Sequence, residues 1–239
     1  MLGFSPLPFR ITALAGLSGG LGYAGFAYTG FFFAPAAHAS ILLPGSLPLW
    51  TALLSVVILG DRIPAARVAG LVLIMAGCIL GGITSLMNAS SGGQSWIGDL
   101  LFASASLCWG FYGVMLRKHS LNAVAATTAL TAFTCAVFLP LYATAVLSGL
   151  VPSRLAEAPW QELAFQAIFQ GVGSVVVSGI SFALMVRHFG PVRSTMITAV
   201  VPGLSALGAA MVLGEPLHAT LIAGLALVTL GILIGVQRT

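Results

Sequence analysis

Eight stretches of mostly apolar residues follow one another along the 239-residue chain, and they limit its possible folds more than any other feature. Crossing the hydrocarbon core of a bilayer takes a helix of about 20 apolar residues. The stretches cover residues 12–33, 37–59, 66–86, 97–116, 124–147, 163–186, 192–213 and 218–236. They are too long and too evenly apolar for barrel strands, in which apolar residues alternate. The sequence therefore predicts an all-α, polytopic transmembrane helix bundle of about eight spans.

The composition agrees with a chain that lies in lipid. Hydrophobic residues make up 59% of the chain and charged residues only 6%, whereas a soluble domain carries roughly 25% charged residues. The net charge of +4 comes from scattered residues and forms no basic and aromatic patch, so we expect the lipid bilayer as a partner and no nucleic acid. Cys78, Cys108 and Cys135 lie in apolar runs without metal-binding spacing, and we expect no metal and no cofactor.

The basic residues predict how the chain crosses the membrane. If the N-terminus is cytoplasmic and there are eight crossings, only Arg154 lies on the far side. The cytoplasmic side then holds Arg10, Arg62, Arg67, Arg117, Lys118, Arg187, Arg193 and Arg238. Short cytoplasmic loops carry an excess of Lys and Arg, so this split predicts an integral protein of the cytoplasmic (inner) membrane with both termini cytoplasmic.

The chain repeats itself after 154 residues. This shift places Ser40 on Ser194, Pro48 on Pro202 and Leu59-Gly60 on Leu213-Gly214, all in one ungapped frame. It also places Gly77 and Gly81 on Gly231 and Gly235. Identities of Pro, Ser and paired Gly are not explained by apolar composition, so they indicate an internal repeat.

The two copies are predicted to cross the membrane in opposite senses. Arg62 and Arg67 follow the second stretch, while the corresponding segment 215–218 holds no Arg or Lys. Inverted-topology repeats are typical of secondary transporters, which bind substrate near the midplane between the repeats. We expect a first repeat of three helices in residues 1–90, incomplete by two helices, and a second repeat of five helices in residues 97–239.

Motifs at the helix ends resemble a known family. Leu59-Gly60-Asp61-Arg62 and Leu213-Gly214-Glu215-Pro216 form corresponding turns, and the second repeat opens with Gly98-Asp99-Leu100-Leu101 followed by Cys108-Trp109-Gly110-Phe111-Tyr112. The chain is similar in these motifs to the EamA-type drug/metabolite transporters of the DMT superfamily. The resemblance implies two five-helix inverted repeats around a cavity for small organic solutes, although the first two helices have no counterpart here.

Polar residues within the apolar stretches are candidates for the wall of a substrate cavity. Gln166, Gln170 and Ser174 follow one another at four-residue spacing, which places them on one helix face. Amides in lipid are costly unless paired, so this face is expected to look into the protein. The alternative is that these residues only form hydrogen bonds that hold the bundle together.

A second set of candidates lies in the corresponding helices and in the aromatic residues. Ser40 and Pro48 share a face in one copy, as do Ser194, Thr198 and Pro202 in the other, and a proline inside a span frees a backbone carbonyl. A bent helix at a cavity and a simple packing kink both fit this pattern. Four aromatic residues away from the span ends are further cavity candidates, namely Trp109, Tyr112, Tyr23 and Tyr28. His38 and His188 lie near span ends and are expected at the headgroup level.

Gly77 and Gly81, with Gly231 and Gly235, have the spacing that permits close helix packing. They fit packing within one chain and a homodimer seam equally well.

No nucleophile, metal or phosphate motif is present, and no carboxylate lies in the middle of a span, so we expect no enzyme. The leading hypothesis is a transporter of unknown small organic solutes or metabolites by alternating access. The alternative is a truncated or structural membrane protein that does not transport.

Overall fold

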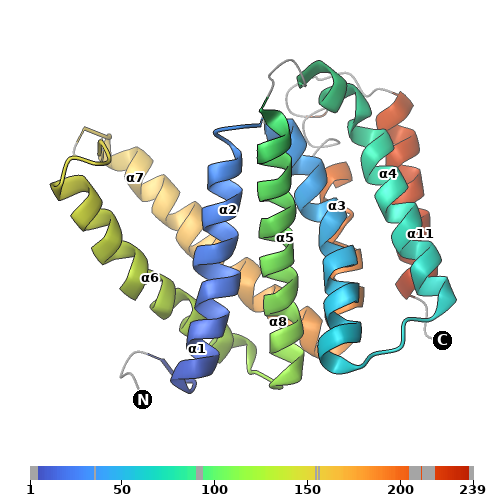
Figure 1. Ribbon diagram of the computed structural model, residues 1–239, viewed down its shortest axis with the longest axis horizontal. Coiled ribbons are helices and arrows are strands. Elements are labelled where there is room, and N and C mark those ends of the chain that lie inside the picture. The colour runs from blue at the N-terminus through green and yellow to red at the C-terminus, as the bar shows by residue number, and fades with distance from the viewer. Residues whose placement is uncertain are drawn as a thin grey trace.

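The described part of the chain is entirely helical apart from its turns (Figure 1). The structure is a computed structural model that describes residues 5–34, 36–89, 94–153, 155, 157–204, 211 and 219–236. No strand occurs in these ranges. The predicted all-α fold class is confirmed.

The first predicted span is one continuous helix with an unusual middle. It begins as α1 (Phe9–Ala15), continues as the π-helical η1 (Gly16–Gly22) and ends as α2 (Tyr23–Gly30). A π-helix bonds residue i to i+5 and is therefore wider than an α-helix.

The next two spans form a helical hairpin. α3 (Ala36–Leu54) contains two prolines and passes into a short π-helix, η2 (Ser55–Leu59). Gly60 ends this span in the left-handed conformation at φ +69°, which glycine adopts without strain. α4 (Ala65–Ala89) then returns across the bundle.

Helices α5 (Ser95–Lys118) and α6 (Ala123–Leu147) follow, and Asn122 caps the N-terminus of α6. The Asn122 side-chain oxygen accepts hydrogen bonds from the backbone N–H groups of Val124 and Ala125 at 3.0 and 3.2 Å. These bonds satisfy donors at the start of α6 that have no partner within the helix.

The last spans begin with another mixed helix. α7 (Trp160–Gln166), the π-helical η3 (Ala167–Ser178) and α8 (Gly179–Phe189) run without interruption, and α9 (Pro191–Thr198) starts after a turn at Gly190. The chain is helical again at 201–204, while most of the rest of the predicted span 192–213 and the turn at Glu215 lie outside the described residues.

The helix that ends the described chain, α11 (Ala219–Val236), packs along α4 in the opposite direction (Figure 1). A side chain on Gly70 would begin 2.5 Å from the carbonyl oxygen of Gly231, and one on Gly77 would begin 2.6 Å from that of Gly224. The 154-residue shift carries Gly70 onto Gly224 and Gly77 onto Gly231. Each glycine therefore contacts the counterpart of the other, as surfaces related by a two-fold axis do.

Length and composition make several helices suitable for crossing a membrane. In the described ranges four qualify fully, at Ile41–Leu59, Ser95–Lys118, Ala123–Leu147 and Trp160–Phe189. Shorter apolar helices lie at Ala65–Leu80 and Ile222–Val236. The chain is a polytopic integral membrane protein, as predicted.

Candidate functional site

A cavity of about 1350 Å³ opens between the helices. Its wall takes residues from η1, α2, α3 and α4 of the N-terminal part and from α5, α6, η3, α8, α9 and α11 of the C-terminal part. Small-molecule sites are typically roughly 300–1000 Å³, so there is room for a small organic solute together with water.

An aromatic cluster centred on Trp109 forms part of the cavity wall. The ring centroid of Trp109 lies 5.2 Å from that of Tyr23, 5.4 Å from that of Tyr112 and 5.2 Å from that of Phe182. All three pairs are tilted, a geometry in which the edge of one ring approaches the face of another. The cluster joins α2, α5 and α8 and offers flat apolar surface to a ligand.

Hydroxyl and amide groups line the rest of the wall. Thr127, Thr131 and Thr134 are spaced by four and three residues and so share one face of α6. Gln170 and Ser174 of η3 also line the cavity.

Among the described residues that line the cavity, none is charged. Transfer of an ion from water to a site without counter-charges is expensive, because the ion gives up hydration that neutral dipoles replace only in part.

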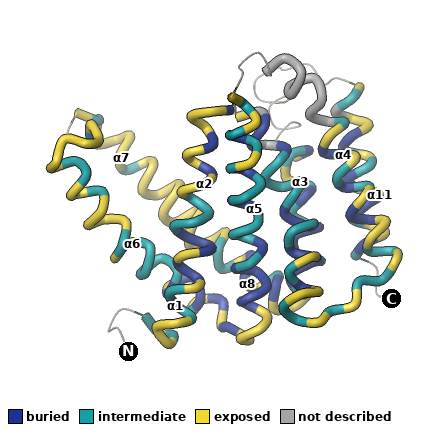
Figure 2. Tube along the Cα trace, viewed as in Figure 1, coloured by how far each residue is buried: buried dark blue, intermediate teal, exposed yellow. Residues whose placement is uncertain are grey.

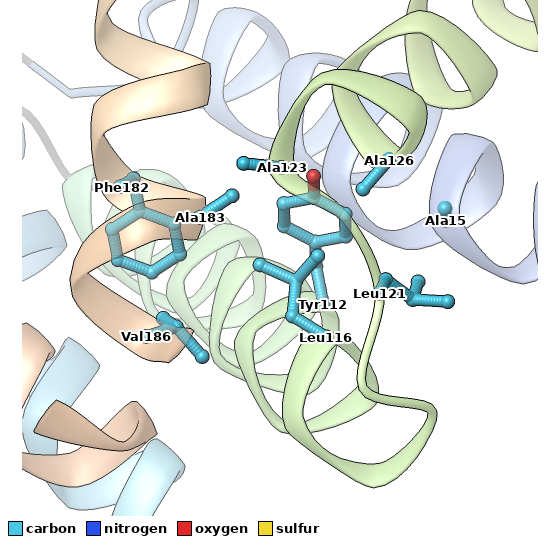
Figure 3. Close-up of a cluster of buried hydrophobic side chains, with 9 residues drawn as sticks. All are labelled: Ala15, Tyr112, Leu116, Leu121, Ala123, Ala126, Phe182, Ala183 and Val186. Atoms are coloured by element: carbon cyan, nitrogen blue, oxygen red, sulfur yellow. The ribbon is translucent and has the colours of Figure 1, made fainter. Parts of the chain in front are cut away.

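A cluster of buried side chains packs beside one end of the cavity, and we call this end the closed end (Figure 3 shows the cluster). Tyr112 and Val186 are each 1% exposed there. The cluster also holds Ala15, Leu116, Leu121, Ala123, Ala126, Phe182 and Ala183. It joins α1, α5, α6 and α8 where they approach one another.

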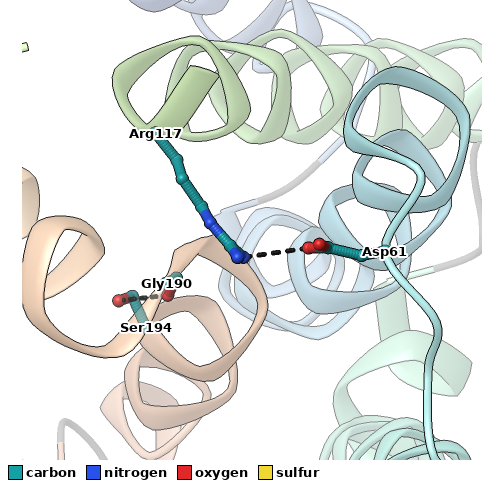
Figure 4. Close-up of polar contacts among 4 residues, drawn as sticks. All are labelled: Asp61, Arg117, Gly190 and Ser194. Atoms are coloured by element: carbon teal, nitrogen blue, oxygen red, sulfur yellow. Dashed lines mark hydrogen bonds and ion pairs between the residues drawn. The ribbon is translucent and has the colours of Figure 1, made fainter. Parts of the chain in front are cut away.

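Polar contacts reinforce the closed end (Figure 4). Arg117 at the end of α5 donates to a carboxylate oxygen of Asp61 at 2.9 Å, which ties α5 to the turn after η2. Ser194 donates from its hydroxyl to the Gly190 carbonyl at 2.8 Å and steadies the start of α9.

At the opposite end, α6 and the α7–η3 segment diverge from the other helices (Figure 2). No residue of α7 or η3 is buried, and the buried residues of α6 all lie in its first two turns. The cavity is therefore flanked by exposed helices at this end, which we call the open end.

A family model described as the EamA-like transporter family matches residues 96–236, which is more than half of the chain. The chain belongs to this family. The resemblance inferred from the helix-end motifs is confirmed, and the protein is a membrane transporter of the drug/metabolite type by family.

Individual relatives of this EamA-like chain carry transporter names. The uncharacterized transporter YyaM of Bacillus subtilis (strain 168) is 25% identical over 219 residues, covering 87% of this chain and 68% of that protein. The aromatic amino acid exporter YddG of Ancylobacter novellus is 28% identical, covering 91% of this chain and 77% of that protein. A solved crystal structure with 20% identity covers 96% of this chain and 76% of its own at a TM-score of 0.75, which shows a common fold.

Eight of the twelve cavity residues predicted from the sequence line the cavity of the EamA-like chain. They are Gln170, Ser174, Trp109, Tyr112, Tyr23, Tyr28, Thr198 and Pro202. The structure brings them together from α2, α5, η3, α9 and the helical residues after it.

Three other predicted residues lie outside the cavity wall. Gln166, the last residue of α7, is exposed and is not among the residues that line the cavity. Pro48 and Ser194 are buried in contacts between helices. Of the two alternatives for Pro48 and Ser194, packing between helices therefore fits better than a place in the cavity wall. The side chain of Ser40 lies outside the described residues.

The predicted packing glycines contact one another within the chain. Gly231 lies against Gly70 and Ile74, and Gly77 lies against Gly224 and Val228. Gly235 lies against Met196 and Gly70, whereas the side of Gly81 is outside the described residues. Of the two alternatives for this seam, packing within one chain is the one present.

Sequence reasoning missed several residues at the site. Phe182 and the three α6 threonines belong to the cavity wall, and only their helical spacing hinted at a shared face. The contact of His38 was missed as well, since it is 3% exposed and its Nδ1 lies 2.6 Å from the Asp99 carboxylate. The two residues are far apart in sequence, so no local pattern signals this pair.

Proposed function

We propose that this EamA-like chain carries small organic solutes of zero net charge across the cytoplasmic membrane by alternating access. The observation that carries the proposal is the cavity of about 1350 Å³ that both parts of the chain build, with no charged side chain among its described lining residues and a packed cluster at one end. Such a cavity admits a solute from one side while a packed cluster blocks the other.

The wall chemistry favours solutes with an aromatic ring. The cluster around Trp109 supplies tilted ring contacts, which are worth about 0.5–1.5 kcal/mol per pair beyond area burial. The hydroxyl groups of Thr127, Thr131 and Thr134 and the amide of Gln170 supply hydrogen bonds to the polar part of the solute. The relative named as an aromatic amino acid exporter makes amino acids of this type suitable probes.

The charges favour an orientation with the closed end in the cytoplasm. Arg67, Arg117 and Arg193 are near enough to interact electrostatically at that end, in agreement with the positive-inside rule. Both termini would then be cytoplasmic and the open end would face outward. The exchange of contacts between α4 and α11 supports two inverted repeats, residues 1–90 and 97–239, that rock against each other.

Transport by the purified chain in liposomes tests the proposal. We expect counterflow of labelled phenylalanine or tryptophan, and none of lysine or glutamate, because the wall offers no counter-charge. Trp109→Ala should reduce the flux while Trp96→Ala should not, since Trp96 lies outside the cavity wall. The same flux from liposomes that carry Trp109→Ala would contradict the cavity as the route.

The exposed face of η3 is the observation that favours the alternative, a membrane protein that does not transport. With no buried residue on η3, this side of the cavity lacks a covering helix in the described chain. If correctly inserted chain gives no flux with a broad panel of neutral aromatic and aliphatic solutes, the alternative is favoured.

A further inference from the structure

A second cleft lies outside the closed end, between the turn from α5 to α6 and the end of α8. Its volume is about 570 Å³. Its polar lining residues are Arg117, Ser120, Asn122, Arg187 and His188, and we call it the basic cleft.

The basic cleft carries positive charge without a carboxylate of its own. No Asp or Glu is among its described lining residues, and Asp61, which pairs with Arg117, lies outside this lining. Among the described residues, no carboxylate lies within ion-pair distance of Arg187. Arg67 lies near enough to Arg117 to interact with it electrostatically and adds to the positive charge beside the cleft.

The hydrogen-bonding groups in the basic cleft are suited to an anion with several oxygens. The Asn122 side-chain oxygen is occupied by the cap of α6, which leaves its amide nitrogen to donate. The His188 Nδ1 donates to the Leu184 carbonyl at 2.8 Å, and this bond orients the ring. Two guanidinium groups can each donate two parallel hydrogen bonds to a phosphate.

Apolar side chains at the edge of the basic cleft point to the source of the anion. Phe189 lines the cleft and is 53% exposed, and Leu184, five residues earlier on α8 and outside the lining, is 41% exposed. A soluble anion would gain nothing from these side chains, whereas the acyl chains of a lipid would cover them.

We propose that the basic cleft binds the phosphate headgroup of an anionic phospholipid, with its acyl chains along α8. Basic pockets between transmembrane helices at the cytoplasmic face bind headgroups of this kind. The bound headgroup would neutralise the mutual repulsion of the arginines and hold the α5–α6 turn against α8. The proposal is independent of transport and rests on the contacts of the closed end alone.

Lipid binding by the purified chain tests the proposal. Delipidated protein in detergent receives dioleoylphosphatidylglycerol or dioleoylphosphatidylcholine, and binding is followed by native mass spectrometry and by the rise in Tm. We expect saturable binding of phosphatidylglycerol only. Arg187→Gln should weaken it about fivefold, the effect of roughly one basic residue at a membrane surface. Arg62→Gln, an exposed arginine outside the cleft, is the matched control and should bind as the unmodified chain does.

Two results would overturn the proposal. Equal weakening by Arg187→Gln and Arg62→Gln would show a general effect of surface charge. Displacement of phosphatidylglycerol by inorganic phosphate at equal concentration would show a site for a soluble anion. The Tm of each variant without lipid shows whether the variant is folded. If Arg187→Gln is poorly folded, Arg187→Lys is used instead. It keeps the charge and should bind more phosphatidylglycerol than Arg187→Gln does.

Discussion

The segments η1 and η3 occupy corresponding places in the two copies but lie in different surroundings. The 154-residue shift carries Gly16–Gly22 onto residues 170–176, inside η3, and both segments are wound as π-helix. In η1 four residues are buried, whereas η3 has none.

The difference comes from α6, which covers η1 and leaves η3 open. A side chain on Gly19 would begin 2.7 Å from a methyl group of Leu130, and one on Gly16 would begin 2.7 Å from the Phe133 Cβ. Gly173, the counterpart of Gly19, has nothing closer than a carbonyl oxygen of its own helix at 4.0 Å. The two segments therefore share their winding, while their burial depends on the helix beside them.

A leucine at the two corresponding glycines should give the largest contrast. Gly19→Leu forces Leu130 and Tyr112 to move, and overpacking of this kind costs about 1–3 kcal/mol. Gly173→Leu meets open space and should leave the stability close to that of the unmodified chain. Thermal unfolding of both variants in detergent measures the contrast. Equal losses of stability would mean that η3 is also covered.

Truncation of an aromatic side chain on each side should give a smaller contrast. Phe133→Ala removes the ring that packs against Gly16 of η1 and is expected to cost about 1–2 kcal/mol, below the values for a fully buried phenylalanine. Phe169→Ala on η3 removes a ring that is 60% exposed and should cost little. Unfolding in increasing SDS compares the two, and a larger loss for Phe169→Ala would contradict the assignment of the covered side.

Gln170→Leu should affect transport without affecting stability. Its counterpart in η1 is Gly16, which is covered, whereas Gln170 is exposed and lines the cavity. Loss of one neutral hydrogen bond to the solute, about 0.5–1.5 kcal/mol, should lower the transport rate roughly three- to tenfold. The Tm is measured on the same sample. A lower Tm with unchanged transport per molecule would identify Gln170 as a bundle-stabilising residue.

Chemical labelling should distinguish the exposed segment η3 from the covered segment η1, and neither cysteine variant is expected to change the stability. In a background with the three native cysteines replaced, Ser174→Cys is expected to react with a membrane-impermeant maleimide through the cavity. Ser18→Cys should not react, because Ser18 is 9% exposed and its hydroxyl is bonded to Leu14 at 2.6 Å. Mass spectrometry reads both yields, and rapid labelling of Ser18→Cys would show that α6 moves away from η1.

Part of the candidate site could be predicted because amides in lipid are costly unless paired and because belt aromatics lie at span ends, whereas Trp109 lies inside its span. Trp109 and Gln170 were recognised in this way, and both line the cavity. Gln166 has the same four-residue spacing but lies at the end of α7, outside the cavity wall, so the spacing did not show how far along the helix the cavity extends. The glycine at position 60 predicted the end of the second span. In the structure the span ends there, because Gly60 adopts the left-handed conformation.

The sequence by itself determined that this chain is a bundle of membrane-spanning helices, where the helices lie, and that it resembles the EamA-type transporters. These properties depend on runs of about 20 neighbouring residues and on backbone hydrogen bonds that a helix satisfies within itself. Only the tertiary structure decided that α6 covers η1 and not η3, that His38 meets Asp99, and that Arg117 meets Asp61. The physical reason is that burial and pairing depend on how helices pack, which brings together side chains far apart in the sequence.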